Sequence, residues 1–151
     1  MERAIQEQFL AFLTEHDLLL FYQSGFQKKH STETAILPHW LYLEHTDMQM
    51  ITGAVFTDMK KAFDLVDHEY LLFKLEHYGV RGSSLDWFQN YLTKRTQRVQ
   101  FGNDKSSTQA IHFGVPQGSI SWPLLFVLYI NNLTQCLENC SINIYADDTV
   151  I

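Results

Sequence analysis

The chain has 151 residues, of which 46% are hydrophobic, and it carries 11 basic and 17 acidic residues. This composition is typical of a packed globular domain and excludes disordered and collagen-like proteins. The formal net charge of −6 argues against a protein that coats nucleic acid non-specifically. The longest apolar stretch, 122–130, is about half the roughly 20 residues that a membrane span needs, and the polar N-terminal segment does not resemble a signal peptide. We therefore expect an intracellular protein of the cytoplasm and/or nucleus, with no transmembrane segment.

Two cysteines, Cys136 and Cys140, lie four positions apart, and no second Cys or His pair follows at a metal-binding spacing. This pattern favours a buried or idle thiol pair over a zinc site or a disulfide.

The first half of the chain contains two predicted helices and one strand. Apolar residues at helical spacing predict a helix over 2–16, and a turn is expected at Ser24-Gly25. A second helix is expected through 36–43, although Pro38 would kink it unless the helix begins near there. A largely buried strand is predicted over 51–58, and it delivers the carboxylate of Asp58 at its C-terminal end.

Capping residues indicate the next two helices. Asp67 is predicted to cap a helix that runs to His77 and that Gly79 stops. Ser83 or Ser84 is predicted to cap a following helix that ends at the basic segment after Leu92.

Strands and one long helix complete the chain. Residues 97–101 and 109–113 are predicted to pair around a loop at 102–106. A long buried helix is expected from Ser119 or Ser121 to Leu137, with Pro123 in its first turn. Residues 141–151 then form a predicted hairpin with two acidic residues at its tip.

Three segments carry reactive or polar side chains that folding alone does not explain, namely 56–64, 114–119 and 145–148. Asp147 and Asp148 are adjacent between apolar flanks, and a divalent cation would relieve their repulsion because Mg²⁺ prefers carboxylate oxygens. With Asp58 as a third acid, two cations about 3.5–4 Å apart would support in-line nucleotidyl transfer. The alternative is that an isolated Asp-Asp pair is only a polar turn.

In chain order these three segments resemble motifs A, B and C of reverse transcriptases, and 61–68 is similar to the corresponding segment of non-LTR (LINE-type) retrotransposons. Further segments of the same family resemble 23–32, 91–99 and 123–131. The resemblance therefore covers nearly the whole chain.

The resemblance implies an α+β fold that forms the fingers and partial palm of a right-hand polymerase. The fingers would comprise about 1–50 and 80–117, and the palm about 51–79 and 118–151. The implied activity is RNA-directed DNA polymerisation, with an RNA or DNA primer–template, dNTPs and two Mg²⁺ ions, for which Mn²⁺ could substitute. Because the chain ends three residues after Asp148, we expect the thumb to be absent and the activity of this chain to be small or nil.

The resemblance also implies roles for individual residues. Catalysis and metal binding fall to Asp58, Asp147 and Asp148. Phe63 would lie under the sugar of the incoming nucleotide and disfavour rNTPs, and its alternative is a core aromatic. Nucleotide binding would further involve Gln117, Lys28 and Lys29. Nucleic-acid contacts would involve Pro116, Gly118, Lys94, Arg95 and Arg98.

Two further assignments have plainer alternatives. The cluster of Lys94, Arg95 and Arg98 is either a phosphate-binding strip or only a solvated charged face. The segment 116–118 is either the part of motif B beside the template or a plain strand-to-helix turn.

The chain also departs from the family pattern. Gln27 stands where the family usually has an Arg, and a neutral amide cannot replace its charge at a triphosphate. Trp122 stands where a helix start usually has Gly, and such overpacking commonly costs about 1–3 kcal/mol. The competing functions are a non-catalytic nucleic-acid-binding remnant and a structural or interaction domain.

Overall fold

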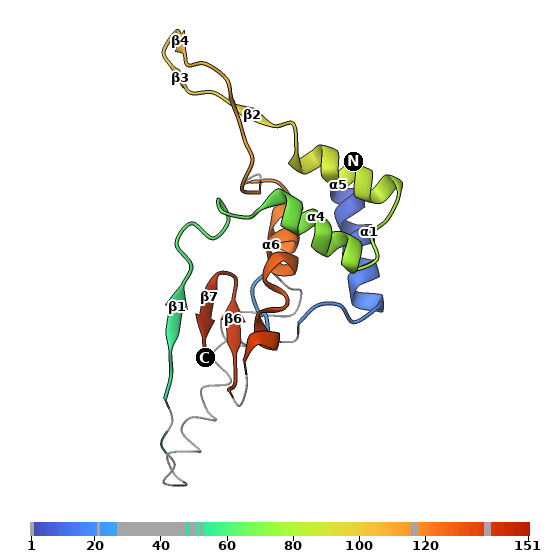
Figure 1. Cartoon of the computed structure of the whole chain (residues 1–151), viewed down its shortest axis with the longest axis vertical. Helices are drawn as coiled ribbons and strands as arrows, with labels where there is room; N and C mark the ends of the chain where they lie inside the picture. The colour runs from blue at the N-terminus through green and yellow to red at the C-terminus, as the bar shows by residue number, and fades with distance from the viewer. Residues whose placement is uncertain are drawn as a thin grey trace. The chain divides into compact units, whose positions relative to one another are not determined.

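The computed structural model describes residues 2–20, 22–26, 48, 51, 53–115, 118–137 and 140–151 (Figure 1). The helix expected through 36–43 lies outside these residues. The described chain contains four α-helices and small antiparallel sheets, which confirms the α+β class. It divides into two compact units, one of Met1–Ala62 with Ile130–Ile151 and the other of Phe63–Tyr129.

The first unit begins with helix α1 (Glu2–Glu15) and contains a three-stranded antiparallel sheet. The sheet has the order β1 (Phe56–Asp58), β7 (Asp148–Val150) and β6 (Asn143–Tyr145), with β7 in the middle (Figure 1). The predicted first helix and the predicted acidic hairpin are both confirmed.

The strand predicted over 51–58 is shorter and more exposed than expected. Only Phe56–Asp58 form β1, and all three residues are exposed, Phe56 to 71%. Pairing continues for one further residue, because the amides and carbonyls of Val55 and Ile151 bond in both directions at 2.8 and 3.0 Å. Within the described part of the sheet β1 has a partner only in β7, and an apolar sequence at such an edge does not ensure burial.

The second unit is built on helices α4 (His68–His77), α5 (Ser83–Leu92) and α6 (Trp122–Ile130). Five consecutive residues of α6, from Leu124 to Leu128, are buried, as expected for a helix that is apolar all round. All three helices contribute buried leucines. These include Leu71, Leu75, Leu92, Leu125 and Leu128.

One of the two predicted caps is correct. The Asp67 side chain accepts a hydrogen bond from the Tyr70 amide at 2.8 Å, and Gly79 follows α4 with φ +94°. For α5 the serine cap is wrong, because Ser83 is already helical and Gly82 occupies the cap position without a side-chain bond. The first helical bond runs from the Asp86 amide to the Gly82 carbonyl, and Gly82 reaches its φ of +56° at little steric cost.

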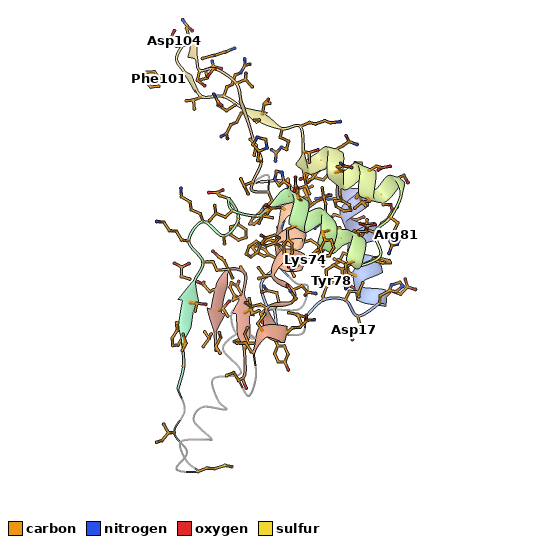
Figure 2. All side chains as sticks on the ribbon, in the orientation of Figure 1. Asp17, Lys74, Tyr78, Arg81, Phe101 and Asp104 are labelled. Atoms are coloured by element: carbon orange, nitrogen blue, oxygen red, sulfur yellow. The ribbon has the colours of Figure 1, made fainter. Side chains whose placement is uncertain are left out.

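The predicted pairing of 97–101 with 109–113 is interrupted. Strand β2 (Thr96–Gln97) pairs with β5 (Gln109–Ala110), whereas β3 (Gln100–Phe101) pairs with β4 (Asp104–Lys105) in a separate hairpin. Figure 2 shows Phe101 and Asp104 near the end of that hairpin.

The helix expected to reach Leu137 ends at Ile130. A 3₁₀ turn, η1 (Leu133–Cys136), follows after two asparagines. The Asn131 side chain donates to the Leu18 carbonyl at 2.7 Å and accepts from the Leu20 amide at 3.0 Å. These bonds hold the segment after α1, and the helix does not continue through Asn131.

Cys136 and Cys140 are free and exposed. The buried alternative is therefore wrong, whereas two free thiols with no disulfide between them agree with the expectation of an idle pair. None of the helices that the structure describes combines the length and apolar character that crossing a bilayer requires.

Candidate active site

The acidic hairpin joins β6 and β7 through a two-residue turn. Tyr145 pairs with Asp148, and Ala146 and Asp147 form the turn between them. Asp148 also lies directly opposite Asp58, the last residue of β1. Because directly opposite residues project from the same face of a sheet, Asp58, Asp148 and Tyr145 form a row on one exposed face.

The other face of the sheet fixes this arrangement. Thr149 and its cross-strand neighbour Ile144 are buried, to 2% and 0% exposure. A one-residue slip would turn Thr149 to solvent and Asp148 inward, so burial of one face specifies the register. The Thr57 hydroxyl adds a hydrogen bond to the Thr149 carbonyl at 3.3 Å.

The chemistry of the pair suits a hard cation. Like charges directly opposite each other destabilise a strand pair, and a divalent ion between them would reverse that effect. Across the residues that the structure describes, no three His, Cys, Asp or Glu side chains form a group that could hold a metal ion. Mg²⁺ commonly takes one or two carboxylates and completes its octahedron with water and substrate phosphates, and the opposed pair Asp58 and Asp148 offers two carboxylates on one sheet face.

Phe63 packs against α6 in the second unit. Its ring centroid lies 4.4 Å from that of Trp122, edge-on, and 4.3 Å from that of Phe126. Both Phe63 and Trp122 are half-buried. The indole is thus accommodated at the start of α6 through an aromatic contact with Phe63.

The start of motif B is held against the end of motif A and the residues just after it. The amide of Gly114 bonds the Val66 carbonyl at 2.8 Å, and that of Val115 bonds the Phe63 carbonyl at 3.1 Å. Gly114 has φ +85°, and an added Cβ would lie 3.0 Å from the carbonyl oxygen of Asp64. The Nε2 of buried His68 donates to the Gly114 carbonyl at 2.7 Å, so this histidine satisfies a backbone hydrogen-bond acceptor.

Motif B continues into residues that the structure does not describe, because Pro116 and Gln117 lie outside it. Gly118 is described and has φ +84°, a conformation that favours glycine. Gln27, Lys28 and Lys29 of the fingers segment also lie outside the described residues.

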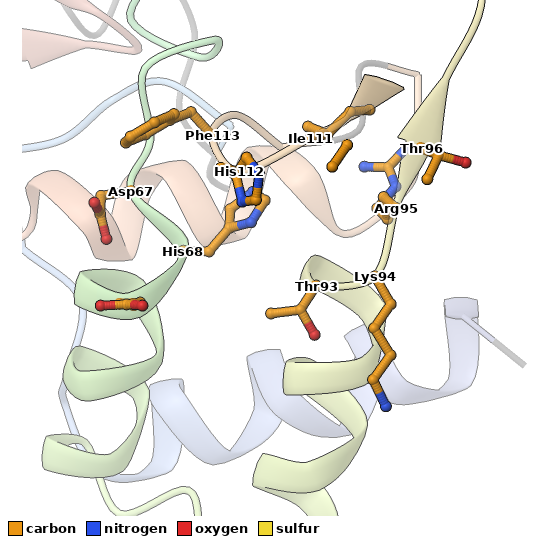
Figure 3. Close-up of a pocket in the computed structure, with 11 residues that line it drawn as sticks. Asp67, His68, Thr93, Lys94, Arg95, Thr96, Ile111, His112 and Phe113 are labelled. Carbon is orange, nitrogen blue, oxygen red and sulfur yellow. The ribbon is translucent and has the colours of Figure 1, made fainter. Parts of the chain in front are cut away.

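Two of the three basic residues in the predicted strip border a pocket of about 450 Å³ (Figure 3). Lys94 and Arg95 line it, and Arg98 does not. In Figure 3 the Lys94 side chain extends away from the two histidines of the pocket. The lining residues are Asp67, His68, Glu69, Thr93, Lys94, Arg95, Thr96, Ala110, Ile111, His112 and Phe113.

One contributor to the site was missed by the sequence reasoning. Buried Gln23 contacts the backbone of Ala146, which lies 123 positions further along the chain. Sequence periodicity cannot reveal such a contact. The sequence indicates this position only through a Gln two residues before a turn glycine, in a segment that resembles the family.

The structure thus describes an α+β domain in which a carboxylate at one strand end lies opposite a carboxylate of an acidic hairpin. The family model described as reverse transcriptase (RNA-dependent DNA polymerase) matches residues 1–151. The chain therefore belongs to the reverse transcriptase family. Members of this family use a divalent metal, a nucleic-acid template and dNTPs.

The relatives of this chain are encoded largely by non-LTR retrotransposons, which confirms the resemblance drawn from its motifs. The probable RNA-directed DNA polymerase from transposon BS of Drosophila melanogaster is 33% identical over 141 residues, which cover 87% of this chain and 15% of that protein. The RNA-directed DNA polymerase from mobile element jockey of the same species is 29% identical over 164 residues, covering 100% of this chain and 17% of that protein. The chain thus spans 15% to 17% of the length of these two relatives.

Proposed function

We propose that this chain carries the metal-binding carboxylates of an RNA-directed DNA polymerase, namely Asp58, Asp147 and Asp148. The observation that supports this proposal most directly is the register that sets Asp58 opposite Asp148, with Asp147 in the adjoining turn. In this proposal the sheet is part of the palm, and the palm and fingers have the ranges expected from the sequence.

Two Mg²⁺ ions at these carboxylates would activate the primer 3′-oxygen and stabilise the leaving pyrophosphate oxygen during attack on the α-phosphate. The protein side chains provide oxygen ligands on an exposed sheet face, where a primer end has access. Phe63 would contact the sugar of the incoming dNTP, and Gln117, Lys28 and Lys29 its other parts. Pro116 and Gly118 would lie beside the template.

Metal binding tests the proposal without requiring turnover. Titration calorimetry of Mg²⁺ into the 151-residue protein should give binding that Asp58→Asn and Asp148→Asn each weaken at least tenfold. Asp104→Asn is the matched control, because Asp104 is an exposed acid on β4 in the second unit. Equal affinity in all four proteins, or no binding by the unmodified chain, would contradict the proposal.

The isolated 151-residue chain is expected to extend a primer on RNA weakly or not at all, since it spans 15% to 17% of the two relatives compared above. Incorporation of labelled dNTPs on a primed RNA template measures this. Robust Mg²⁺-dependent incorporation that disappears in Asp147→Asn would overturn the expected inactivity and support the catalytic assignment.

A second candidate function is nucleic-acid binding without catalysis, and the pocket bordered by Lys94 and Arg95 favours it. Phosphate neutralisation by such residues supplies most non-specific affinity and makes it sensitive to salt. Fluorescence anisotropy with an RNA–DNA hybrid should show affinity that falls with salt and that Lys94→Ala and Arg95→Ala reduce. Absence of binding at low salt, together with no stabilisation of the chain by Mg²⁺, would leave a structural or interaction role.

A further inference from the structure

The segment Tyr22–Gly25 pairs with the acidic hairpin on the side away from β1. The amide of Ile144 bonds the Tyr22 carbonyl at 3.0 Å, and the amide of Ser24 bonds the Ile144 carbonyl at 2.8 Å. Gln23 and Ile144 form a parallel bridge. A segment near the N-terminus is thereby tied to β6, one strand away from Asp148.

The Gln23 side chain continues this attachment to the turn itself. Its Oε1 accepts hydrogen bonds from the amides of Gly25 at 2.7 Å and Ala146 at 3.0 Å, and its Nε2 donates to the Ala146 carbonyl at 3.2 Å. Gln23 is only 1% exposed. A buried amide whose donor and acceptor bind the carbonyl and the amide of the same residue specifies the position of that residue's backbone closely.

Gly25 allows this close approach. A Cβ on Gly25 would lie 2.2 Å from the amide nitrogen of Ala146 and 2.7 Å from its Cα, so no other residue fits without a backbone shift. Gly25 is required here for space, and Gln23 for hydrogen bonds.

Ala146 needs such support. It adopts φ +56°, which is uncommon for a residue with a Cβ and persists only where the surroundings enforce it. Ala146 immediately precedes Asp147 and Asp148. The backbone conformation of Ala146 therefore determines the positions from which both aspartate side chains project.

We propose that Gln23 and Gly25 are positioning residues that hold Ala146 in its positive-φ conformation and so place Asp147 and Asp148 relative to Asp58. This inference rests on the proposed function for its consequence, because correct placement matters only if these carboxylates bind a cation. We call the contacts of Gln23 and Gly25 with Ala146 the clamp. The clamp can be measured separately from metal binding.

Amide hydrogen exchange tests the clamp in the absence of metal. Gly25→Ala leaves the Gln23 side chain intact but should accelerate exchange of the Ala146 amide at least tenfold, and Gln23→Met should do the same. The amides of Val55 and Ile151, at the other end of the sheet, serve as internal controls and should change less than twofold. Unchanged exchange at Ala146 in either variant would overturn the inference.

Mg²⁺ affinity then tests the consequence of the clamp. Gln23→Met and Gly25→Ala should each weaken binding at least tenfold, while Leu75→Ala, which removes a buried side chain of the second unit, should lower stability and leave affinity unchanged. In an Ala146→Gly background the loss caused by Gln23→Met should shrink at least threefold, because glycine adopts positive φ unaided.

The outcomes separate the two proposals. Equal Mg²⁺ affinity in the unmodified chain, Gln23→Met and Gly25→Ala would overturn the positioning role and leave the metal site intact. No Mg²⁺ binding by the unmodified chain would overturn the metal site, and the exchange measurement would still decide the clamp.

Discussion

Lys74 is a buried lysine in the last turn of α4 (Figure 2). Its ammonium donates a hydrogen bond to the Tyr129 carbonyl, and it lies 5.1 Å from the ring centroid of Tyr70 and 5.6 Å from that of Tyr129. Burial nevertheless lowers the pKa of Lys74 from 10.5 to about 8. The charged lysine is therefore tolerated at a cost to stability.

This shift predicts the pH dependence of stability. Between pH 8 and 10.5 the unfolded chain holds the Lys74 proton and the folded chain releases it, so the free energy of unfolding should rise with pH. Relative to Lys74→Met, the rise from pH 7 to pH 10 should reach at most about 3 kcal/mol. Urea denaturation of both proteins measures it, and parallel pH profiles would refute the argument.

For Trp122, the sequence and the structure suggest opposite effects of the indole on the stability of the fold. Overpacking would make Trp122→Ala neutral or stabilising, whereas the edge-on contact with Phe63 makes the indole a packing partner. We expect Trp122→Ala to lower the free energy of unfolding by roughly 1–3 kcal/mol. Denaturant unfolding at pH 7 measures the change, and a gain in stability would favour overpacking.

At the scale of elements, local signals account for what was predicted correctly. The helices 2–15, 68–77 and 83–92 follow from apolar spacing and nearby turn residues, which act within a few positions. The exposure of β1 and the end of α6 at Ile130 depend on partners far along the chain. Asn131, for example, is the first residue after α6, and its side chain bonds residues 18 and 20.

The buried face of the acidic sheet offers a prediction at this scale. The Thr149 hydroxyl is buried, and the described residues include no hydrogen-bond partner for it. Thr149→Val should therefore leave stability unchanged or raise it by about 1 kcal/mol, without altering Mg²⁺ affinity. Thr57→Val is the comparison, because it removes the bond to the Thr149 carbonyl and should lower stability slightly. Chemical denaturation measures both, and a loss above 1 kcal/mol in Thr149→Val would contradict this view of the sheet.

At the scale of the whole chain, the sequence predicted the acidic residues. It did not predict the residues that hold the acidic turn in place. Asp58, Asp147 and Asp148 were recognised as strand-end and hairpin acids in the family's order, and the register sets two of them opposite each other. Gln23 and Gly25 act through backbone contacts across 123 positions, which no spacing rule reports. The net charge of −6 also changes meaning, because part of it belongs to a proposed cation site.

The most direct test of the central claim is to locate a bound divalent ion on the folded chain. Addition of substoichiometric Mn²⁺ to the ¹⁵N-labelled protein should broaden the amide signals of Asp58, Asp147 and Asp148 first, and Asp148→Asn should abolish this effect. Broadening centred elsewhere, or identical broadening in Asp148→Asn, would contradict the assignment of these carboxylates as the metal-binding residues.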